Sequence, residues 1–364
     1  MISIFSADHA LHDPPHEFLD GALMPIYESP ARAAIIHAAL ERAALGPILS
    51  PRAFGLAPIQ AAHSDDYLGY LEQIYERWVA AGGAPAAVLP GTLAVRWMGR
   101  RCDHPVAAPG YYCFDMSAPI VAGTYRAARA AADVALTGAA LLLEGQRAVY
   151  TLCRPPGHHA GSDLYGGYCF LNNAAIAAEY LLQTMNDEGR TMNEEREPGN
   201  DHRSSFIAHR SARVAILDID YHHGNGTQQI FYARGDVLFV SIHADPLRQY
   251  PYFAGYADER GTGAGLGYNL NIPLEAGVAD ERYFAVLDEA LAAIRAFAPR
   301  FLVVSAGLDT FGGDPLGDFA LTAAAYPQIG RRIAALGLPT LIVQEGGYAI
   351  TELGENVVGL LQGF

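Results

Sequence analysis

The stretch ILDIDYHHGNG at 216–226 begins as an apolar strand and then places two aspartates and two histidines within six residues. Side chains alternate between the two faces of an extended chain, so Asp218, Asp220 and His222 are expected on one face. Two neighbouring carboxylates on a buried strand repel each other unless a cation lies between them. The stretch therefore predicts a metal site, whereas a lone aspartate or histidine would more often be a hydrogen-bonded core residue.

Short apolar runs alternate with helical patterns along the chain. Strands are predicted at 2–5, 148–152, 214–220, 237–243, 300–307 and 340–346, and helices at 30–44, 64–80, 122–144, 172–185, 280–297, 322–335 and 352–361. This alternation predicts a three-layer α/β/α fold with a central, mostly parallel sheet. No linker rich in Pro or Ser divides the 364 residues, so one domain over 1–364 is expected, with a polar insertion at 186–211.

The composition argues against nucleic acid and membranes as partners. The net charge of −15 leaves no surplus of Lys and Arg for phosphate contacts, although it would suit a cationic substrate. No signal peptide is recognisable, and no apolar run approaches the roughly 20 residues of a membrane span. The four cysteines have no CxxC spacing and are expected to be reduced, so a cytoplasmic location is expected.

Polar residues follow the carboxyl ends of several predicted strands. His158 and His159 follow the strand at 148–152, Asp309 follows 300–307, and Tyr348 follows 340–346. Open α/β sheets bind their ligands at this edge, so Asp309 is a plausible third ligand beside Asp220 and His222. Three protein ligands with an open position are typical of a catalytic metal, whereas structural zinc sites close with four. Taken alone, the histidines could be a pair satisfied by backbone groups, and the tyrosine a packed aromatic.

Five motifs carry a resemblance to a known family: RPPGHHAG at 154–161, GGYCFLNNAAIAA at 166–178, ILDIDYHHGNGTQQIFY at 216–232, SAGLDTFGGDPLG at 305–317 and EGGY at 345–348. In this order and spacing they resemble the histone deacetylase and acetylpolyamine amidohydrolase family. The segments IFSADHALH at 4–12, GYYCF at 110–114 and YPYFAGYADERGTGAG at 250–265 are most similar to bacterial acetylpolyamine amidohydrolases, relatives of the class II deacetylases. The resemblance implies the arginase/deacetylase fold and hydrolysis of an acetylpolyamine or a similar N-acetylated alkylamine by metal-activated water.

The resemblance implies roles for the residues at the strand ends. Asp220, His222 and Asp309 would hold one catalytic Zn²⁺, or Fe²⁺ or Co²⁺ in its place. A bound metal lowers the pKa of water from about 15.7 towards 7. His158 would act as the general base, and Asp218 would orient it from behind.

The second histidine and the tyrosine would complete the catalytic group. His159, paired with Asn225, would help carry a proton to the leaving amine. Class I deacetylases have an aspartate where Asn225 stands, and a neutral partner should leave the pKa of His159 lower than a carboxylate would. Tyr348 would donate a hydrogen bond to the amide carbonyl oxygen as charge builds on it.

The resemblance also implies one or two structural K⁺ ions. The first would be surrounded by the Asp218 carboxylate, the carbonyls of Asp220, His222 and Ile242, and the hydroxyl of Ser241. All-oxygen ligation of this kind suits a hard ion and not zinc. A second ion would use the carbonyls of Phe231, Arg234, Val237 and Tyr268.

Aromatic residues are expected to line a substrate tunnel. Tyr168 and Tyr250 match the family positions that flank the acyl chain, and Gly167 would offer its carbonyl to the substrate amide. An apolar slot admits methylene groups and rejects bulkier ones. The alternative is that either tyrosine is a core residue.

Near the GYY segment the sequence departs from the polyamine enzymes that it resembles. Acidic residues there attract the distal ammonium, yet this chain has Val106 and Ser117 at those places, with Asp115 as the nearby carboxylate. If Asp115 does not reach the tunnel mouth, the preference for polyamines weakens and the case for an acetyl-lysine or another small N-acyl amine becomes stronger. The polyamine enzymes are dimers in which a partner loop narrows the tunnel, so a homodimer is expected.

Two other classes remain as alternatives. An arginase-type hydrolase would need extra carboxylates for a second manganese, but Gly224 occupies the position two residues after His222. A non-catalytic acyl-binding protein would be expected to lack Tyr348, a histidine or a metal ligand, and all of these are present.

Overall fold

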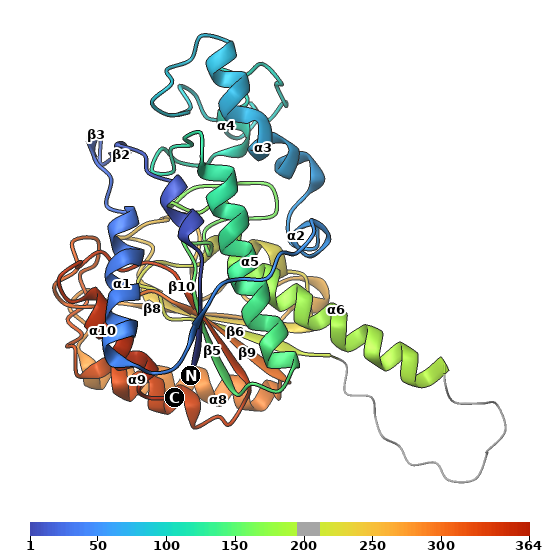
Figure 1. Ribbon diagram of the computed structural model, residues 1–364, viewed down its shortest axis with the longest axis vertical. Coiled ribbons are helices and arrows are strands. Elements are labelled where there is room, and N and C mark those ends of the chain that lie inside the picture. Colours follow the sequence, from blue (N-terminus) through green and yellow to red (C-terminus); the bar gives the residue numbers. More distant parts are fainter. Residues whose placement is uncertain (195–211) are drawn as a thin grey trace.

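The computed structural model describes residues 1–194 and 212–364, and its centre is an eight-stranded parallel sheet (Figure 1). The strand order is β4-β1-β5-β10-β9-β6-β7-β8. In that order the strands span Ile48–Leu49, Ile2–Phe5, Ala148–Leu152, Thr340–Gln344, Phe301–Ala306, Val214–Asp218, Val237–Ala244 and Asn269–Leu274. Every pairing within the sheet is parallel, which confirms the predicted α/β fold.

Helices cover both faces of the sheet. Residues of α3 (Asp65–Ala80), α5 (Thr124–Leu143) and α6 (Asn173–Glu194) share one apolar core with one face of the strands. Residues of α1 (Pro30–Ala43), α8 (Asp280–Phe297), α9 (Ala325–Ala334) and α10 (Leu353–Leu361) form the core on the other face. In β6 alternate residues enter the two cores, so its apolar run is buried on both sides, as in other parallel sheets.

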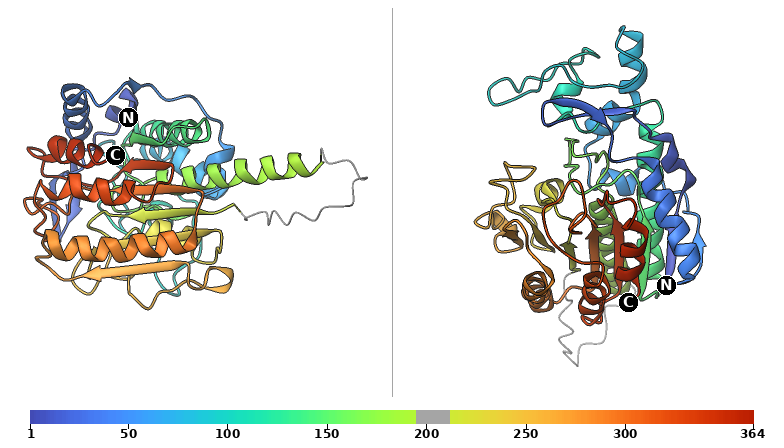
Figure 2. Two further views of the ribbon diagram at one scale, coloured as in Figure 1. Left: turned by 90° about the horizontal axis from the view of Figure 1, so that it is seen from below. Right: turned by 90° about the vertical axis from the view of Figure 1, so that its left-hand side faces the viewer.

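Smaller elements complete the fold. They are the hairpin of β2 (His16–Leu19) and β3 (Ala22–Pro25), the short helices α2 (Ala57–Gln60), α4 (Pro109–Tyr112) and α7 (Asn225–Phe231), and the 3₁₀ turns Ala7–Leu11 and Gly263–Gly265. The hairpin and the α3–α4 region lie beyond one end of the sheet (Figures 1 and 2). No helix of the described residues combines the length and apolar character that a membrane crossing requires.

The structure differs from the predicted elements in several places. Strand β6 ends at Asp218 and not at 220, because the Asp218 carboxylate accepts the main-chain N–H of Asp220 at 3.1 Å and turns the chain out of the sheet. Seven elements had no counterpart among the predicted ones: strands β2, β3, β4 and β8 and helices α2, α4 and α7. Helix α6 continues through 186–194 and extends beyond the sheet (Figure 2), so the predicted insertion begins as a helix. The rest of the insertion lies outside the described residues, and the single domain over 1–364 stays a prediction.

Candidate active site

The polar residues that follow four strands converge because those strands are neighbours. Strands β5, β10, β9 and β6 lie side by side at the middle of the sheet, and all four are parallel. Their carboxyl ends therefore meet at one edge, where each chain leaves its strand in a loop. These loops carry the predicted histidine pair, the tyrosine and the three predicted metal ligands.

The three predicted ligands form one compact group. Ligand atoms of Asp220, His222 and Asp309 all lie within 4.8 Å of one another. Nδ1 of His222 lies 3.1 Å from Asp309 Oδ2 and 3.4 Å from Asp220 Oδ1. The other oxygens are held in place, since Asp220 Oδ2 accepts the N–H of Gly346 at 2.9 Å and Asp309 Oδ1 accepts that of Tyr221 at 2.9 Å. Glycine is required at 346, because a Cβ there would lie 2.5 Å from Asp309 Oδ2.

The charges of this group fit a bound cation. Both aspartates are fully buried, and burial together with repulsion by Asp220 raises the pKa of Asp309 to about 7. Burial alone would lower the pKa of His222, but its hydrogen bonds with Asp220 and Asp309 raise it to about 9. Two carboxylates and one imidazole are a donor set that divalent transition metals accept, and a divalent cation would neutralise the two negative charges.

Each histidine of the predicted pair has the partner that the sequence predicted. His158 Nδ1 lies 3.0 Å from Asp218 Oδ2, and His159 Nδ1 lies 2.7 Å from Asn225 Oδ1. Burial would lower the pKa of His158, but the carboxylates of Asp220 and Asp218 raise it to about 10. Burial and the neighbouring imidazoles of His158 and His222 lower the pKa of His159 well below its usual range. The two imidazoles therefore differ in proton affinity while their ring centroids lie only 4.0 Å apart.

Tyr348 lies at the same edge of the sheet and faces the cavity. Its side chain is buried, and its ring centroid lies 5.7 Å from that of Tyr168. The main-chain N–H of Tyr348 donates to Asp314 Oδ2 at 2.6 Å. The guanidinium of Arg32 lies 4.7 Å from the centroid of the phenol ring, within the range of a cation–π contact.

Sequence reasoning missed a buried ion network behind this tyrosine. Glu28 Oε1 accepts from both Arg32 Nη1 and Arg154 Nε at 2.8 Å. Arg32 also donates to the main-chain carbonyls of Gly347 at 2.6 Å and Glu345 at 2.7 Å. The network therefore fixes the main chain of the loop that carries the phenol. Glu28 and Arg32 are four residues apart, a common helical pair spacing, but nothing in the sequence connects them to residues about 315 positions away.

A cavity of about 410 Å³ leads to these groups. His158, His159, His222 and Tyr348 line it together with Tyr168, Gly167 and Tyr250, the residues predicted for a tunnel. Glycine is required at 167, where φ is +53° and a Cβ would lie 2.3 Å from the imidazole of His159. The predicted histidine pair, the tyrosine and the tunnel residues thus border one space, whereas Asp218 and Asn225 lie behind the histidines and do not line it.

Asp115 also lines the cavity, but its carboxylate already accepts hydrogen bonds from neighbouring residues of the cavity wall. Its Oδ2 accepts from the hydroxyl of Tyr250 at 2.6 Å, the N–H of Gly167 at 2.8 Å and the hydroxyl of Ser117 at 2.9 Å. Burial raises the pKa of Asp115, although these hydrogen bonds oppose the shift. Val106 is exposed.

Three of the five residues predicted for the first potassium ion lie next to one another across two strands. The register pairs Asp218 of β6 with Ser241 of β7, which Ile242 follows. His243 Nε2 lies 2.8 Å from the carbonyl oxygen of Gly255 and must donate to it. Its Nδ1 therefore accepts the hydroxyl hydrogen of Ser241 at 2.8 Å, which leaves the lone pairs of the Ser241 oxygen free.

His223, which follows the ligand His222, is buried outside the ligand group. Its Nε2 lies 3.1 Å from Gln228 Oε1, and its ring centroid lies 4.6 Å from that of His243.

Comparisons with known proteins agree with this geometry. Residues 26–191 and 204–364 match the family model described as histone deacetylase domain. The chain is 46% identical over 371 residues to acetylpolyamine amidohydrolase 1 of Pseudomonas aeruginosa, covering 100% of this chain and 99% of that protein. It is 42% identical to acetylpolyamine amidohydrolase of Mycoplana ramosa, covering 99% and 98% of the two chains.

A solved structure has the same fold over the full length. The crystal structure of acetylpolyamine aminohydrolase from Burkholderia pseudomallei aligns with a TM-score of 0.87 at 40% identity, covering 100% of this chain and 98% of that one. The chain therefore belongs to the histone deacetylase family, a family of metal-dependent deacetylases and amidohydrolases, and is acetylpolyamine amidohydrolase-like over its full length.

Proposed function

We propose that the protein removes the acetyl group from an acetylpolyamine or a similar N-acetylated alkylamine. The observation that carries the proposal is the convergence of three candidate metal ligands, two differently tuned imidazoles and a phenol at one edge of the sheet, where His158, His159, His222 and Tyr348 line a cavity of about 410 Å³. The full-length similarity to acetylpolyamine amidohydrolases supports the same substrate class.

Asp220, His222 and Asp309 would hold one divalent cation, which we propose to be Zn²⁺, with Fe²⁺ or Co²⁺ as substitutes. When bound, such a cation polarises a carbonyl group and makes a water molecule acidic at neutral pH. The buried carboxylate pair beside a single imidazole supports this choice of site.

His158 would serve as the general base through Nε2, because its Nδ1–H donates to Asp218. The carboxylate fixes the tautomer and stabilises the imidazolium that forms when Nε2 takes a proton. His159 would help deliver a proton to the leaving amine, and Asn225 would keep its ring oriented. The phenol of Tyr348 would donate a hydrogen bond to the amide oxygen as negative charge develops there.

We further propose a structural K⁺ ion at Asp218, Ser241 and Ile242, with the carbonyls of Asp220 and His222 as its remaining ligands. The Ser241 hydroxyl hydrogen is used by His243, so the oxygen keeps its lone pairs for a cation, which supports this site. The second K⁺ site, at the carbonyls of Phe231, Arg234, Val237 and Tyr268, stays a prediction.

We propose that the active form is a homodimer. The segment between α3 and α4 exposes apolar side chains, with Trp97 88% exposed and Val95 and Met98 about half exposed, in the region that rises beyond the sheet (Figure 1). Exposed apolar groups clustered in this way are typical of a protein interface. A second copy of the chain is the proposed partner, which analytical ultracentrifugation of wild type and Trp97→Ser would test.

A class II type acetyl-lysine deacetylase is the second candidate. The hydrogen bonds of the Asp115 carboxylate to Tyr250 and Gly167 favour it, because a carboxylate engaged in the wall is less available to a distal ammonium.

One comparison of kcat/KM separates these functions. Acetylputrescine, acetylspermidine, acetylcadaverine and an acetyl-lysine peptide should be tested on zinc-loaded and iron-loaded protein, with metal content measured in parallel. We expect the acetylated diamines to be the best substrates. A wide margin for the peptide would select the second candidate, two Mn²⁺ per chain would indicate an arginase-type enzyme, and no amide hydrolysis would indicate an acyl-binding protein.

A further inference from the structure

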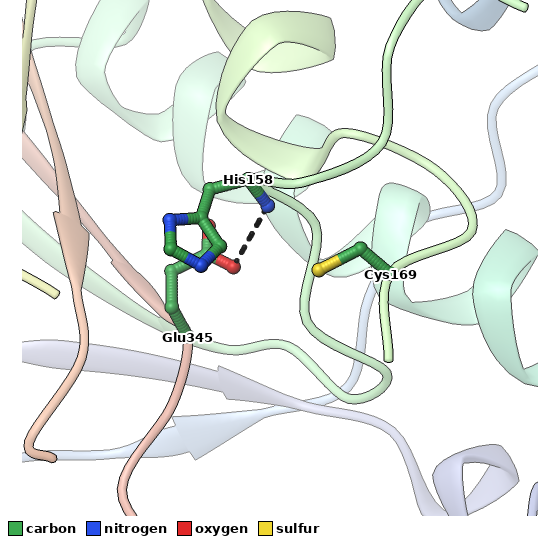
Figure 3. Close-up of side chains that lie close together, drawn as sticks. All are labelled: His158, Cys169 and Glu345. Carbon is green, nitrogen blue, oxygen red and sulfur yellow. Dashed lines mark hydrogen bonds between the residues drawn. The ribbon is translucent and has the colours of Figure 1, made fainter. Parts of the chain in front are cut away.

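The carboxylate of Glu345 is buried, and it has no role in the proposed mechanism. Glu345 follows β10, and its side chain is fully buried. With His158 and Cys169 it forms a second group whose possible ligand atoms all lie within 4.8 Å of one another (Figure 3).

The hydrogen bonds of Glu345 argue against a second metal here. Its Oε2 accepts the main-chain N–H of Gly157 at 2.6 Å and that of His158 at 3.2 Å, the bond drawn in Figure 3. Its Oε1 lies 3.3 Å from the hydroxyl of Ser305, which donates to it. Burial, and then the charge of Glu345, raise the pKa of the Cys169 thiol well above its usual range, so the sulfur is a protonated thiol and a poor ligand.

We propose that Glu345 is a positioning residue that holds the main chain of the general base, an inference that rests on the proposed function. We call the pair of N–H bonds accepted by Glu345 the clamp, and the main chain of His158 is held at both its N–H and its carbonyl. The N–H of His158 donates to Glu345, while the carbonyl of His158 accepts the N–H groups of Gly226 and Thr227, each at 3.1 Å. The side chain then needs only the Asp218 contact to aim Nε2 at the ligand group.

The loop at 154–159 needs such a clamp because it follows β5 and has left the sheet ladder. Its buried N–H groups must find other acceptors, and an unpaired one is costly. Gly157 lies in a tight space, since a Cβ there would meet Asn173 N at 2.5 Å and Leu171 O at 2.7 Å. The carboxylate of Glu345 reaches this space from the neighbouring strand β10, which pairs directly with β5.

Glu345 also ties the base to the phenol. Its main-chain carbonyl accepts from Arg32 at 2.7 Å, and Tyr348 follows three residues later on the same loop. A shift of Glu345 would therefore change the distance between His158 and Tyr348.

The clamp requires an oxygen acceptor at the right reach and not a charge. Burial raises the pKa of Glu345 to about 7, and an uncharged carboxyl group still offers one oxygen to both N–H groups. A glutamine oxygen can do the same while its amide nitrogen donates to the hydroxyl of Ser305. Methionine has a similar length and no such oxygen.

The test compares Glu345→Gln, Glu345→Met and Glu345→Asp in the metal-loaded protein, with exposed Glu352→Met as the matched control. We expect Gln and the control to stay within about threefold of the wild-type kcat, and Met to lose about 10² in kcat, the effect typical of a misplacement of about 1 Å. KM and metal content should not change. Asp, which is too short to reach Gly157, should have a lower kcat than Gln.

Hydrogen exchange of the peptide at 153–161 reports the clamp without substrate. It should be about tenfold faster in the Met variant, equivalent to about 1.4 kcal/mol, and unchanged in the Gln variant. Unaltered exchange in the Met variant, loss of its metal, or higher turnover with Asp than with Gln would overturn the proposal. If the Met variant does not fold, the comparison of Gln with Asp decides. Absence of wild-type turnover would refute the proposed function alone, since the exchange experiment still tests the clamp.

Discussion

Replacing Asp115 by asparagine separates two roles for this carboxylate. As a receptor for the distal ammonium it would act on cationic substrates only. As part of the wall it would act on every substrate, because it holds Tyr250, Gly167 and Ser117. The three hydrogen bonds to Oδ2, with lengths of 2.6, 2.8 and 2.9 Å, favour the second role.

The loss expected for Asp115→Asn follows from its acceptors. The asparagine oxygen can retain the bonds from Tyr250 and Gly167, but its NH₂ group would then face the N–H of Ser117, which now donates to Asp115 Oδ1 at 3.1 Å. Loss of one hydrogen bond to a charged acceptor costs about 1.5–3 kcal/mol. We therefore expect the free energy of unfolding to fall by about 2 kcal/mol, and kcat/KM to fall about tenfold as the wall loosens.

The assay uses two substrates that differ only at the far end. N-(4-aminobutyl)acetamide carries an ammonium group, and N-pentylacetamide carries a methyl group in its place. Asp115→Asn should lower kcat/KM for both by the same factor, and the ratio of the two should stay within about threefold of wild type, which corresponds to less than 1 kcal/mol. Asp20→Asn is the matched control, because Asp20 lines the same cavity and is exposed. A loss confined to the ammonium substrate would refute the wall assignment.

Three further outcomes are expected. Tyr348→Phe should keep its metal and lose about 10² to 10³ in kcat, and an unchanged kcat would remove the phenol from the mechanism. His63 accepts the N–H of Asn172 at 2.9 Å, and burial lowers its pKa to about 4. The unfolded chain therefore binds more protons between pH 4 and 6.5, so the free energy of unfolding should fall by about 1.4 kcal/mol as the pH falls to 5.5. In urea titrations the His63→Gln variant should lack this fall in the free energy of unfolding. A pH dependence equal to that of the wild type would contradict the role of His63. Chelation should abolish turnover and lower Tm, one equivalent of Zn²⁺ should restore both, and a requirement for two would contradict a single ion.

The convergence of the site could be predicted from the sequence, but the strand order could not. Parallel strands place their carboxyl ends together, so polar residues after apolar runs meet wherever the strands are neighbours. The order depends on how the connecting helices pack. Strand β10 is the last in the chain, yet it lies between β5 and β9. The position of β10 between β5 and β9 brings Glu345 to the N–H groups of Gly157 and His158. These residues precede Glu345 by 188 and 187 positions in the sequence.

The missed elements have local sequences that tertiary contacts override. Strand β8, NLNIPL, contains two asparagines and Pro273, which are unfavourable in most strands. It is tolerated because β8 lies at the edge of the sheet, where proline costs no ladder bond with a further strand. Helix α7 begins at Asn225, and Gly226 is its second residue. No side chain fits at position 226, since a Cβ would lie 2.3 Å from the main chain of Ala160.

Several buried carboxylates of this protein accept main-chain N–H groups of the loops at the site, a role that metal-ligand motifs in the sequence do not indicate. A loop that leaves a strand loses its ladder partners, and its buried N–H groups must be paired by other acceptors. Glu345 supplies them for His158, Asp115 for Gly167, and Asp314 for Tyr348 at 2.6 Å. Each acceptor lies on a different segment from the group that it holds, so hydrogen bonds connect the loops of the site to one another. The rigidity of the site therefore depends on residues outside the proposed ligand group, and substitutions that remove these acceptor oxygens should lower kcat while the metal stays bound.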